Sequence, residues 1–454
     1  MKKNLLAALV ASAVLLTGCD IYSPDVESLL SAPLLSDLQT HVDEALRDVV
    51  GQDIRLKYPL SGEYRSPYLF YDLDEDGEEE ALVLYSLEEG AEELVYLQIL
   101  DREDGVWRAG SALPGLGNEV DFVRFAHFLS DGSVTPVIGW RGENTDSNIL
   151  AVYNVENHLM REVFSHHYSK LAFSDFGSGG TDRMLIAETG SPLSFSLIGE
   201  DSDHTLSVLD RAVSDHRLLY LSEPVVGLLE PDLPGAVFDG LVTSDNMASV
   251  LVGVRDGQIV LPQNASDGSS GGSVIVLGGD LFSRTFRANG ARTCDIDGDG
   301  ILEIPSSVPV PGYTGTLPSE LAVQYFTRYS VCCGRDFKPG DIVYESRSGG
   351  FRFFLPEEWL PLYENGQLSV FYSPEDREFT FFLFEDTLSR RENELLRIRV
   401  VSSADHLASF DPEGSFLLAE RGRFRYYAAL PEDVPAGAPS LSEETVRANF
   451  DLLS

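Results

Sequence analysis

Short apolar runs separated by Gly/Asp/Ser turns dominate the chain from about residue 54 to residue 355. Runs such as ALVLYSL, ELVYLQIL, PVIGW and SVLVGV are rich in leucine, β-branched and aromatic residues. Many short strands at regular spacing indicate an all-β sandwich, barrel or propeller. Before them, SDLQTHVDEALRDVVG has an apolar stripe at helical spacing, a Ser36/Gln39 capping box and a closing Gly51. These signals predict a helix within residues 35–53.

The turns recur along this β-rich region. A glycine ends the turn ahead of an apolar run at five places, at intervals of 48 to 65 residues: Gly77, Gly132, Gly180, Gly235 and Gly300. The longest interval contains a Gly/Ser-rich insertion at 264–273. Four strands with their turns fit a unit of this length, which is the size of a propeller blade. The sequence therefore predicts a mainly β, propeller-like array of four-stranded units over residues 54–350, with five units visible and a ring-shaped arrangement.

The pattern changes near residue 350. Long aromatic segments such as FRFFLPEEWL and FTFFLFED carry no Asp-rich turn, and the chain closes with SLSEETVRANFDLL. Ser440 and Glu443 have the spacing of a capping box, and Val446, Phe450 and Leu453 would share one face of a helix. We expect residues 351–454 to form a small α+β domain that ends in a helix.

The N-terminal segment has the pattern of an export signal. Lys2 and Lys3 precede an apolar core of 12 residues, Leu5 to Leu16, which is too short to span a bilayer comfortably. The core ends in the sequence LTGC, which resembles the lipobox of bacterial lipoproteins. An ordinary secretory signal with an incidental cysteine is the alternative.

The lipobox resemblance implies that residues 1–18 are removed and that Cys19 becomes the mature N-terminus. Acyl chains such as palmitate on Cys19 would anchor the protein to the cell membrane on its extracytoplasmic side, because more than one chain suffices for stable anchoring. Residues 19–34 would then be a tether.

The chain is strongly acidic, with 73 Asp and Glu against 33 Lys and Arg and a net charge of −40. Such a surface disfavours nucleic acid and anionic lipid headgroups as partners and suits a solvated extracytoplasmic protein. We expect a monomer. Cysteine is sparse after Cys19. Cys294 can pair with Cys332 or Cys333 or stay free, and no Cys/His spacing indicates zinc.

Two acidic loops carry the clearest chemical signal. The first, DLDEDGEEE, offers the carboxylates of Asp72, Asp74 and Asp76, the backbone carbonyl of Glu78 and the carboxylate of Glu80. The second, DIDGDGILE, repeats this order with Asp295, Asp297, Asp299, the carbonyl of Ile301 and Glu303. Calcium takes six to eight oxygen ligands, and alternate carboxylates in a tight loop deliver several to one point. The sequence therefore predicts two structural calcium ions.

The loops begin like EF-hands but do not continue like them. An EF-hand needs a glutamate at its twelfth position, where this chain has Val83 and Ser306, and it needs flanking helices. The loops instead resemble those of FG-GAP or VCBS β-propeller repeats. This resemblance implies that an ion fastens the turn between two blade strands.

The three middle copies depart from the acidic pattern. His127, Leu129 and Thr135 occupy ligand positions in the second copy, and Gly177 and Arg183 do so in the third. We expect neither to bind an ion. The fourth copy, near Glu230 and Asp232, keeps too little of the pattern to decide.

No catalytic residue emerges from the sequence. HExxH is absent, and DGSSGGS lacks the strand–turn–helix frame of a G-x-S-x-G nucleophile elbow. His166 and His167 fit a strand edge, and Trp107, Trp140 and Trp359 lie in strand-like runs and are expected in the core. The domain order is similar to that of uncharacterised lipoproteins of anaerobic Gram-positive bacteria. We expect a non-catalytic protein that binds a protein or glycan at the cell surface. A propeller-type polysaccharide hydrolase or lyase is the main alternative, and an accessory role in envelope assembly is a weaker one.

Overall fold

The fold is taken from a computed structural model. It describes residues 35–88, 94–103, 105–142, 148–156, 158–214, 216–262, 282–288, 290–313, 322–334, 336–386, 388, 393–402 and 414–453. The predicted signal peptide, Cys19, the tether and the 264–273 insertion lie outside these residues. Among the residues described, no helix is both long and apolar enough to cross a membrane.

The first three sheets follow one another along the chain. The first sheet contains β1 (Ile54–Leu56), β2 (Tyr68–Tyr71), β3 (Glu80–Leu87), β4 (Val95–Glu103) and β5 (Val106–Pro114). The second contains β6 (Glu119–Ala126), β7 (Thr135–Arg141), β8 (Asn148–Glu156) and β9 (Leu159–Tyr168). The third contains β10 (Lys170–Ser174), β11 (Arg183–Glu188), β12 (Leu193–Glu200) and β13 (Leu206–Ser214).

Three further sheets complete the described fold. The fourth contains β14 (Tyr220–Leu221), β15 (Val225–Glu230), β16 (Leu233–Leu241), β17 (Met247–Arg255) and β18 (Gln258–Val260). The fifth contains β19 (Glu303–Pro309), β20 (Tyr325–Cys333), β21 (Asp336–Ser346), β22 (Phe351–Phe354) and β28 (Phe450–Leu452). The sixth contains β23 (Leu368–Ser373), β24 (Glu378–Leu383), β25 (Glu394–Ser402), β26 (Ser415–Arg421) and β27 (Phe424–Ala429).

The four described helical segments are short apart from the first. They are α3 (Asp37–Val50), the 3-10 turn η2 (Glu357–Trp359), α5 (Leu360–Glu364) and α6 (Glu443–Ala448). The protein is thus mainly β, and its first five sheets are antiparallel sheets of four or five strands. The predicted propeller-like array of four-stranded units, with a short N-terminal helix and a C-terminal α+β part, is confirmed.

Each sheet packs face to face on the next, and this explains the continuous apolar runs in the sequence. In β3, Ala81, Val83 and Tyr85 face α3, whereas Leu82 and Leu84 join the core shared with the second sheet. Successive side chains on a strand point to opposite faces, so a strand buried on both sides must be apolar throughout. Similar cores lie between all later neighbours.

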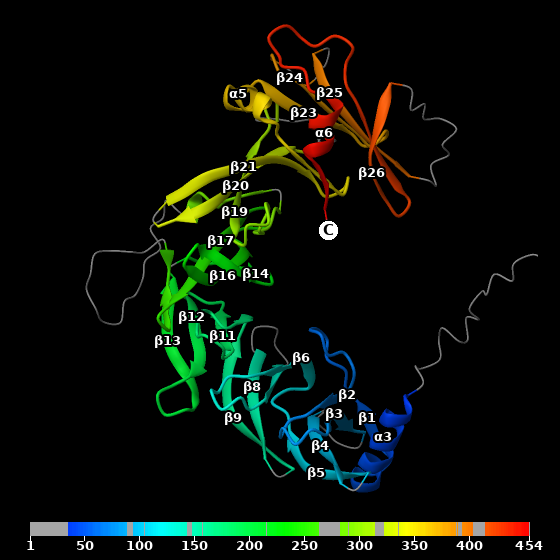
Figure 1. Cartoon of the computed structure of the whole chain (residues 1–454), viewed down its shortest axis with the longest axis vertical. Coiled ribbons are helices and arrows are strands. Elements are labelled where there is room, and N and C mark those ends of the chain that lie inside the picture. The colour runs from blue at the N-terminus through cyan, green and yellow to red at the C-terminus, as the bar shows by residue number, and fades with distance from the viewer. Residues whose placement is uncertain are drawn as a thin grey trace, which may run out of the picture.

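The sheets follow an open arc rather than the expected ring (Figure 1). At one end α3 covers the outer face of the first sheet, where Val42 and Leu46 are fully buried. In a closed ring that face would pack on the last unit. At the other end, the fifth sheet packs on the sixth. Both ends are therefore capped, as in repeat proteins whose terminal elements shield the core.

The predicted N-terminal helix has the predicted cap. The Ser36 side chain accepts a hydrogen bond from the Gln39 backbone N–H, the Gln39 side chain accepts from the Ser36 backbone N–H, and Gly51 follows the helix. Its apolar stripe packs on the first sheet. Local sequence signals and tertiary packing agree here.

The predicted C-terminal helix needs correction. The N-cap is Ser442, which accepts from the Thr445 N–H at 3.0 Å, and not Ser440. The helix ends at Ala448, and Phe450 continues as β28, which pairs with β22. Phe450 is extended because it stacks on Phe351 in the core of the fifth and sixth sheets, with ring centroids 5.3 Å apart. The expected boundary at residue 350 falls in the β21–β22 turn, within the fifth sheet.

Candidate metal centre

The first acidic loop connects β2 to β3 at one edge of the first sheet. Tyr71 and Glu80 are the last pair of the β2–β3 ladder, so the loop from Asp72 onward is closed at its base. Glu75 and Gly77 both adopt left-handed backbone conformations, with φ of 62° and 91°. The second of these is easy for glycine, whereas a glutamate rarely adopts the first.

Three side chain–backbone hydrogen bonds hold the carboxylates of this loop. The Leu73 N–H donates to Glu80 Oε2 at 2.6 Å, the Gly77 N–H donates to Asp72 Oδ2 at 3.1 Å, and the Glu78 N–H donates to Asp76 Oδ1 at 2.8 Å. Glu80 and Asp72 therefore each use one carboxylate oxygen to fix the loop and keep the other for a different partner.

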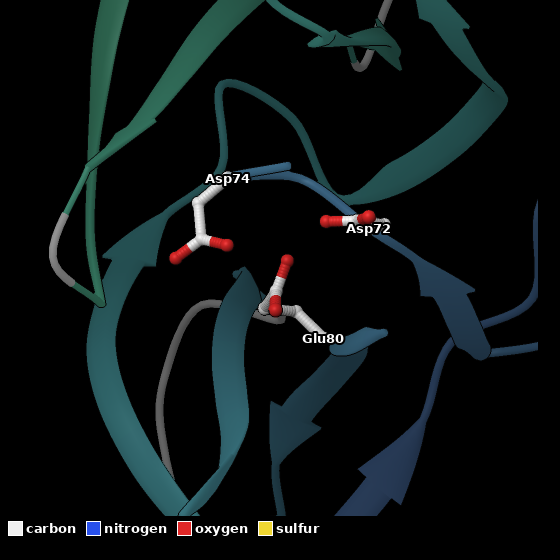
Figure 2. A group of neighbouring side chains, drawn as sticks. All are labelled: Asp72, Asp74 and Glu80. Atoms are coloured by element: carbon white, nitrogen blue, oxygen red, sulfur yellow. The ribbon is translucent and has the colours of Figure 1, made fainter. Parts of the chain in front are cut away.

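The carboxylates of Asp72, Asp74 and Glu80 turn toward a common space (Figure 2). One oxygen from each lies within 4.8 Å of the others. Oxygens on opposite sides of a calcium ion are about 4.6–5.2 Å apart, because each bond is about 2.3–2.6 Å. Asp72 Oδ1 and Glu80 Oε1 are buried and have no hydrogen-bond partner in the protein. Two unpaired buried anionic oxygens facing a third carboxylate are the donor set that a hard cation satisfies.

Burial makes the charges of this loop costly. Glu80 is only 2 % exposed, and burial raises the pKa of its carboxyl to about 7, helped by the negative charges of Asp74 and Asp101. The pKa of Asp74 is also raised, first by burial and then by the charge of Asp76. Burial and neighbouring negative charges raise the pKa of a carboxyl group, and a bound cation lowers it again.

The second acidic loop repeats this hydrogen-bond pattern. A bridge between Cys294 and Glu303 closes its base. The Ile296 N–H donates to Glu303 Oε2 at 2.8 Å, the Gly300 N–H to Asp295 Oδ2 at 2.9 Å, and the Ile301 N–H to Asp299 Oδ1 at 2.8 Å. Each bond has its counterpart at the same loop position in the first loop.

The converging carboxylates differ between the loops. In the second loop Asp295, Asp297 and Asp299 meet within 4.8 Å, and all three are exposed. Glu303 is outside this group, although burial raises its pKa to about 6 and the nearby aspartate charges contribute. In the first loop it is Asp76 that lies outside the converging group. The carbonyl oxygens of Glu78 and Ile301 remain predicted ligands.

The loops also connect neighbouring sheets. The Leu302 N–H donates to the Leu228 carbonyl of β15 at 2.7 Å, and the Leu228 N–H donates to the Gly300 carbonyl at 3.3 Å. The second loop is thus bonded to the fourth sheet. In the first loop, Leu73 is buried in the core between the first and second sheets. An ion bound in either loop would therefore also stabilise a contact between neighbouring sheets.

The second and third copies keep the turn but only one aspartate each of the acidic pattern, Asp131 and Asp175. In the second, the Ser133 N–H donates to Asp131 Oδ1 at 2.9 Å, which matches the fifth-position bond of the acidic loops. The glutamate position holds Thr135, whose hydroxyl donates to the Ala126 carbonyl at 2.9 Å. This copy is bonded to the third directly, because the Asp182 N–H donates to the His127 carbonyl at 2.7 Å.

The fourth copy is a tight hairpin rather than an acidic loop. Gly235, expected in the turn, lies inside β16, where an added Cβ would meet the Val252 carbonyl at 2.4 Å. Glu230 Oε1 accepts the Gly334 N–H at 2.7 Å and so holds the β20–β21 turn of the fifth sheet. A direct contact between sheets therefore occupies the carboxylate that could have bound an ion.

The remaining residues singled out by sequence have structural surroundings. Trp140 and Trp359 are fully buried, as expected, whereas Trp107 is only partly buried and packs against the core beside α3. His166 and His167 lie on β9, the outermost strand of the second sheet. Cys294, Cys332 and Cys333 are free thiols.

One acidic neighbour of the first loop was not found from sequence. Asp101 on β4 is 9 % exposed, and its charge raises the pKa of Glu80. Its Oδ2 lies 2.5 Å from Nδ1 of His158, in the turn between β8 and β9 of the second sheet. Only the pairing of β3 with β4 brings it near the loop. No local motif could have indicated it.

Comparisons with known proteins add little to this description. No family model matches the chain, and no curated protein matches it. Among solved structures, the exotype rhamnogalacturonan lyase YesX has 13% identity and a TM-score of 0.29, covering 65% of this chain and 62% of the lyase. The Dos1 propeller has 10% identity and a TM-score of 0.27, covering 72% of this chain and 78% of Dos1. Similarities this weak carry no functional conclusion. From its own sheets, the chain is a mainly β protein with a propeller-like array.

Proposed function

We propose that this chain is a calcium-stabilised, lipid-anchored extracytoplasmic protein that binds a protein or glycan at the cell surface without catalysing a reaction. Calcium is held by the two acidic loops, with Asp72, Asp74 and Glu80 at the first and the three aspartates of DIDGDG at the second. The propeller-like array is the rigid part that presents the binding surface.

The pair of buried, unpaired oxygens in the first loop is the observation that carries this proposal. Asp72 Oδ1 and Glu80 Oε1 have no partner in the protein, and an unpaired buried charge is strongly destabilising. A divalent cation removes this penalty and couples ion binding to folding. Its oxygen-only donor set suits calcium, and comparable extracellular sites have a Kd of about 10⁻⁴–10⁻³ M.

Thermal unfolding with and without calcium tests the metal part of the proposal. At about 10 mM calcium each site should add about 1.4–2.7 kcal/mol of stability, because ligand is then about 10 to 100 times Kd. The purified protein should therefore melt at a lower temperature in EDTA, and magnesium should restore less stability than calcium does.

Matched substitutions separate the sites from general acidity. Asp74→Asn and Asp297→Asn each change the third position of one acidic loop and should each remove part of the calcium-induced shift in Tm. The double variant should lose all of it. Asp131→Asn, in the non-acidic second copy, is the control and should keep the full shift. An unchanged Tm in EDTA, or a smaller shift in the control, would contradict the proposal.

The anchoring part has its own test. Cys19→Ser should move the protein from the membrane fraction to the soluble extracytoplasmic fraction, and mass spectrometry of the wild-type N-terminal peptide should show acyl chains on Cys19. A Cys19→Ser variant that stays with the membrane, or an unacylated wild-type peptide, would contradict lipid anchoring and leave the calcium test unaffected.

A further inference from the structure

A cavity of about 620 Å³ opens where the first three sheets meet. Its walls come from the segment between β1 and β2, from β6, and from the end of β9 with β10. This volume is within the usual range for small-ligand sites, about 300–1,000 Å³. The strand β6, which contributes to the cavity wall, lies on the inner side of the arc (Figure 1).

A preorganised polar cluster forms one wall of the cavity. Asp121 lies at a β-bulge in β6, where the pairing with β7 shifts register. Its Oδ1 accepts from Arg141 Nε at 3.0 Å and from Arg141 Nη2 at 2.8 Å, and its Oδ2 accepts from the Tyr168 hydroxyl at 2.7 Å. Bulges commonly redirect a side chain beside a functional site.

The absence of a side chain at Gly139 leaves room for this cluster. A Cβ on Gly139 would lie 2.5 Å from the Tyr168 hydroxyl and 2.3 Å from the Phe122 ring, so any larger residue would displace both. Burial raises the pKa of Tyr168 far above its ordinary value, and Asp121 adds to the effect. The Tyr168 hydroxyl therefore remains a hydrogen-bond donor at physiological pH, and the cluster keeps one geometry.

Partly exposed aromatic rings also line the cavity. Tyr71 stacks on Phe125 with ring centroids 4.3 Å apart, and Tyr64 meets the Phe125 ring edge-on at 5.0 Å. On the same strand the guanidinium of Arg124 lies 4.4 Å from the centroid of the Phe173 ring. Arg124 is exposed, and within the described part of the chain no carboxylate forms an ion pair with it.

The charge of the cavity differs from that of the protein. Three basic and three acidic residues line it: Arg124, Arg141, Lys170, Glu63, Asp121 and Glu223. The whole chain has more than two acids for every base. Arg141 and Lys170 are already paired, with Asp121 and Glu223. Arg124 is thus the positive group of the cavity that is left for a ligand.

Strand addition by a peptide is blocked here. The Leu60 N–H donates to the Val120 carbonyl at 3.0 Å, and the Ser61 N–H donates to the Asp121 carbonyl at 2.7 Å. The chain between β1 and β2 therefore already occupies the free edge of β6. A peptide that binds by adding a strand needs an open edge. Polyphosphate ligands are disfavoured by the charge of −40.

We propose that this cavity binds a short saccharide bearing one carboxylate, that is, a sugar acid. The carboxylate would pair with Arg124, whose planar guanidinium suits two parallel hydrogen bonds. The apolar C–H face of a sugar ring suits the aromatic rings of Tyr64, Tyr71 and Phe125, and its hydroxyls suit the polar cluster around Asp121. This inference deepens the proposed binding function and rests on it, because it names the class of ligand.

A matched pair of disaccharides tests the inference by isothermal titration. The probes are glucuronosyl-β-1,4-glucose and cellobiose, which differ in one carboxylate. Wild-type protein in saturating calcium should bind the acid at least tenfold more tightly, since one charge-assisted pair contributes about 1.4 kcal/mol or more. Arg124→Ala should abolish this preference, and Arg124→Lys should keep only part of it.

Arg255→Ala is the control, because Arg255 is exposed on the fourth sheet and does not line the cavity. It should leave the preference unchanged. Absence of binding by the acid up to millimolar concentration, or a preference that survives in Arg124→Ala, would overturn the inference. The calcium-induced Tm shift of Arg124→Ala, measured in parallel, should equal that of wild type. Failure of saccharide binding with a normal shift therefore counts against this inference alone.

Discussion

The two acidic loops share one backbone conformation but differ in the burial and pairing of their carboxylates. Both have the same three side chain–backbone hydrogen bonds and a left-handed residue at the fourth and sixth positions. In the first loop the converging group includes the buried Glu80, and two carboxylate oxygens are unpaired. In the second loop the converging carboxylates are three exposed aspartates.

This difference predicts unequal dependence on a cation. Water can reach and solvate the exposed aspartates of the second loop when no ion is bound, whereas Glu80 Oε1 has neither water access nor a protein partner. The fourth position shows a second difference, because it is Glu75 in the first loop and Gly298 in the second. The second loop therefore adopts its left-handed fourth position with less backbone strain than the first loop does.

The largest expected effect comes from Glu80→Gln. Glutamine keeps an acceptor for the Leu73 N–H and removes the buried charge, so in EDTA the variant should be more stable than wild type by about 1–3 kcal/mol. In calcium it should be less stable, because it loses a charged ligand. Glu303 is outside the converging group, so Glu303→Gln should change the stability in EDTA and in calcium in the same directions but by less. Denaturant unfolding in both conditions measures this reversal, and equal effects of the two variants would contradict the comparison.

Hydrogen exchange should locate the cation dependence. On moving from calcium to EDTA, the amides of Leu73 and Gly77 should exchange about 10 to 100 times faster, which corresponds to about 1.4–2.7 kcal/mol. The matching amides of Ile296 and Gly300 should change less, because their loop is partly solvated. The Ser133 amide, which donates to the single aspartate of the second copy, serves as the internal control. A larger change in the second loop than in the first would reverse our ranking of the two sites.

The pH dependence should follow Glu80. Its carboxyl pKa rises from 4.5 to about 7 in the folded protein. A raised pKa contributes stability below the unfolded value and loses it as pH rises through the folded value. In EDTA the Tm should therefore fall between about pH 5 and pH 8 through this group, and the calcium-induced shift should grow over the same range because protons compete with calcium. Glu80→Gln should flatten both trends, and trends that persist in this variant would assign them to other groups.

The smallest expected effect tests the fourth position. Gly298→Ala should cost about 1 kcal/mol, because alanine disfavours the left-handed conformation. Glu75→Gly should stabilise the first loop by less than that, since glycine relieves the strain but adds freedom to the unfolded chain. Tm measured in saturating calcium compares the two. Equal and same-signed effects would mean that the fourth position does not distinguish the loops.

Local patterns in the sequence predicted those elements that depend on interactions between residues close in the chain. The capping box of Ser36 and Gln39, the turn glycines Gly77 and Gly300, and the strand runs all appear in the structure. The same grounds predict Ser440 as a cap, but Ser442 has that role, and Phe450 lies in a strand that packs in the aromatic core. At Phe450, tertiary packing therefore outweighed the local helix pattern.

The order of acids and glycines in the two loops, the repeated turns and the apolar runs were determined by the sequence itself, because each depends on residues a few positions apart. Tertiary structure alone decided the rest. It left Glu80 Oε1 buried without a partner, brought Asp101 beside it and opened the array into an arc capped by α3. It also gathered Tyr64, Asp121 and Tyr168 from three separate segments into one cavity. Burial and contacts between sheets depend on residues far apart in the chain, and no local pattern encodes them.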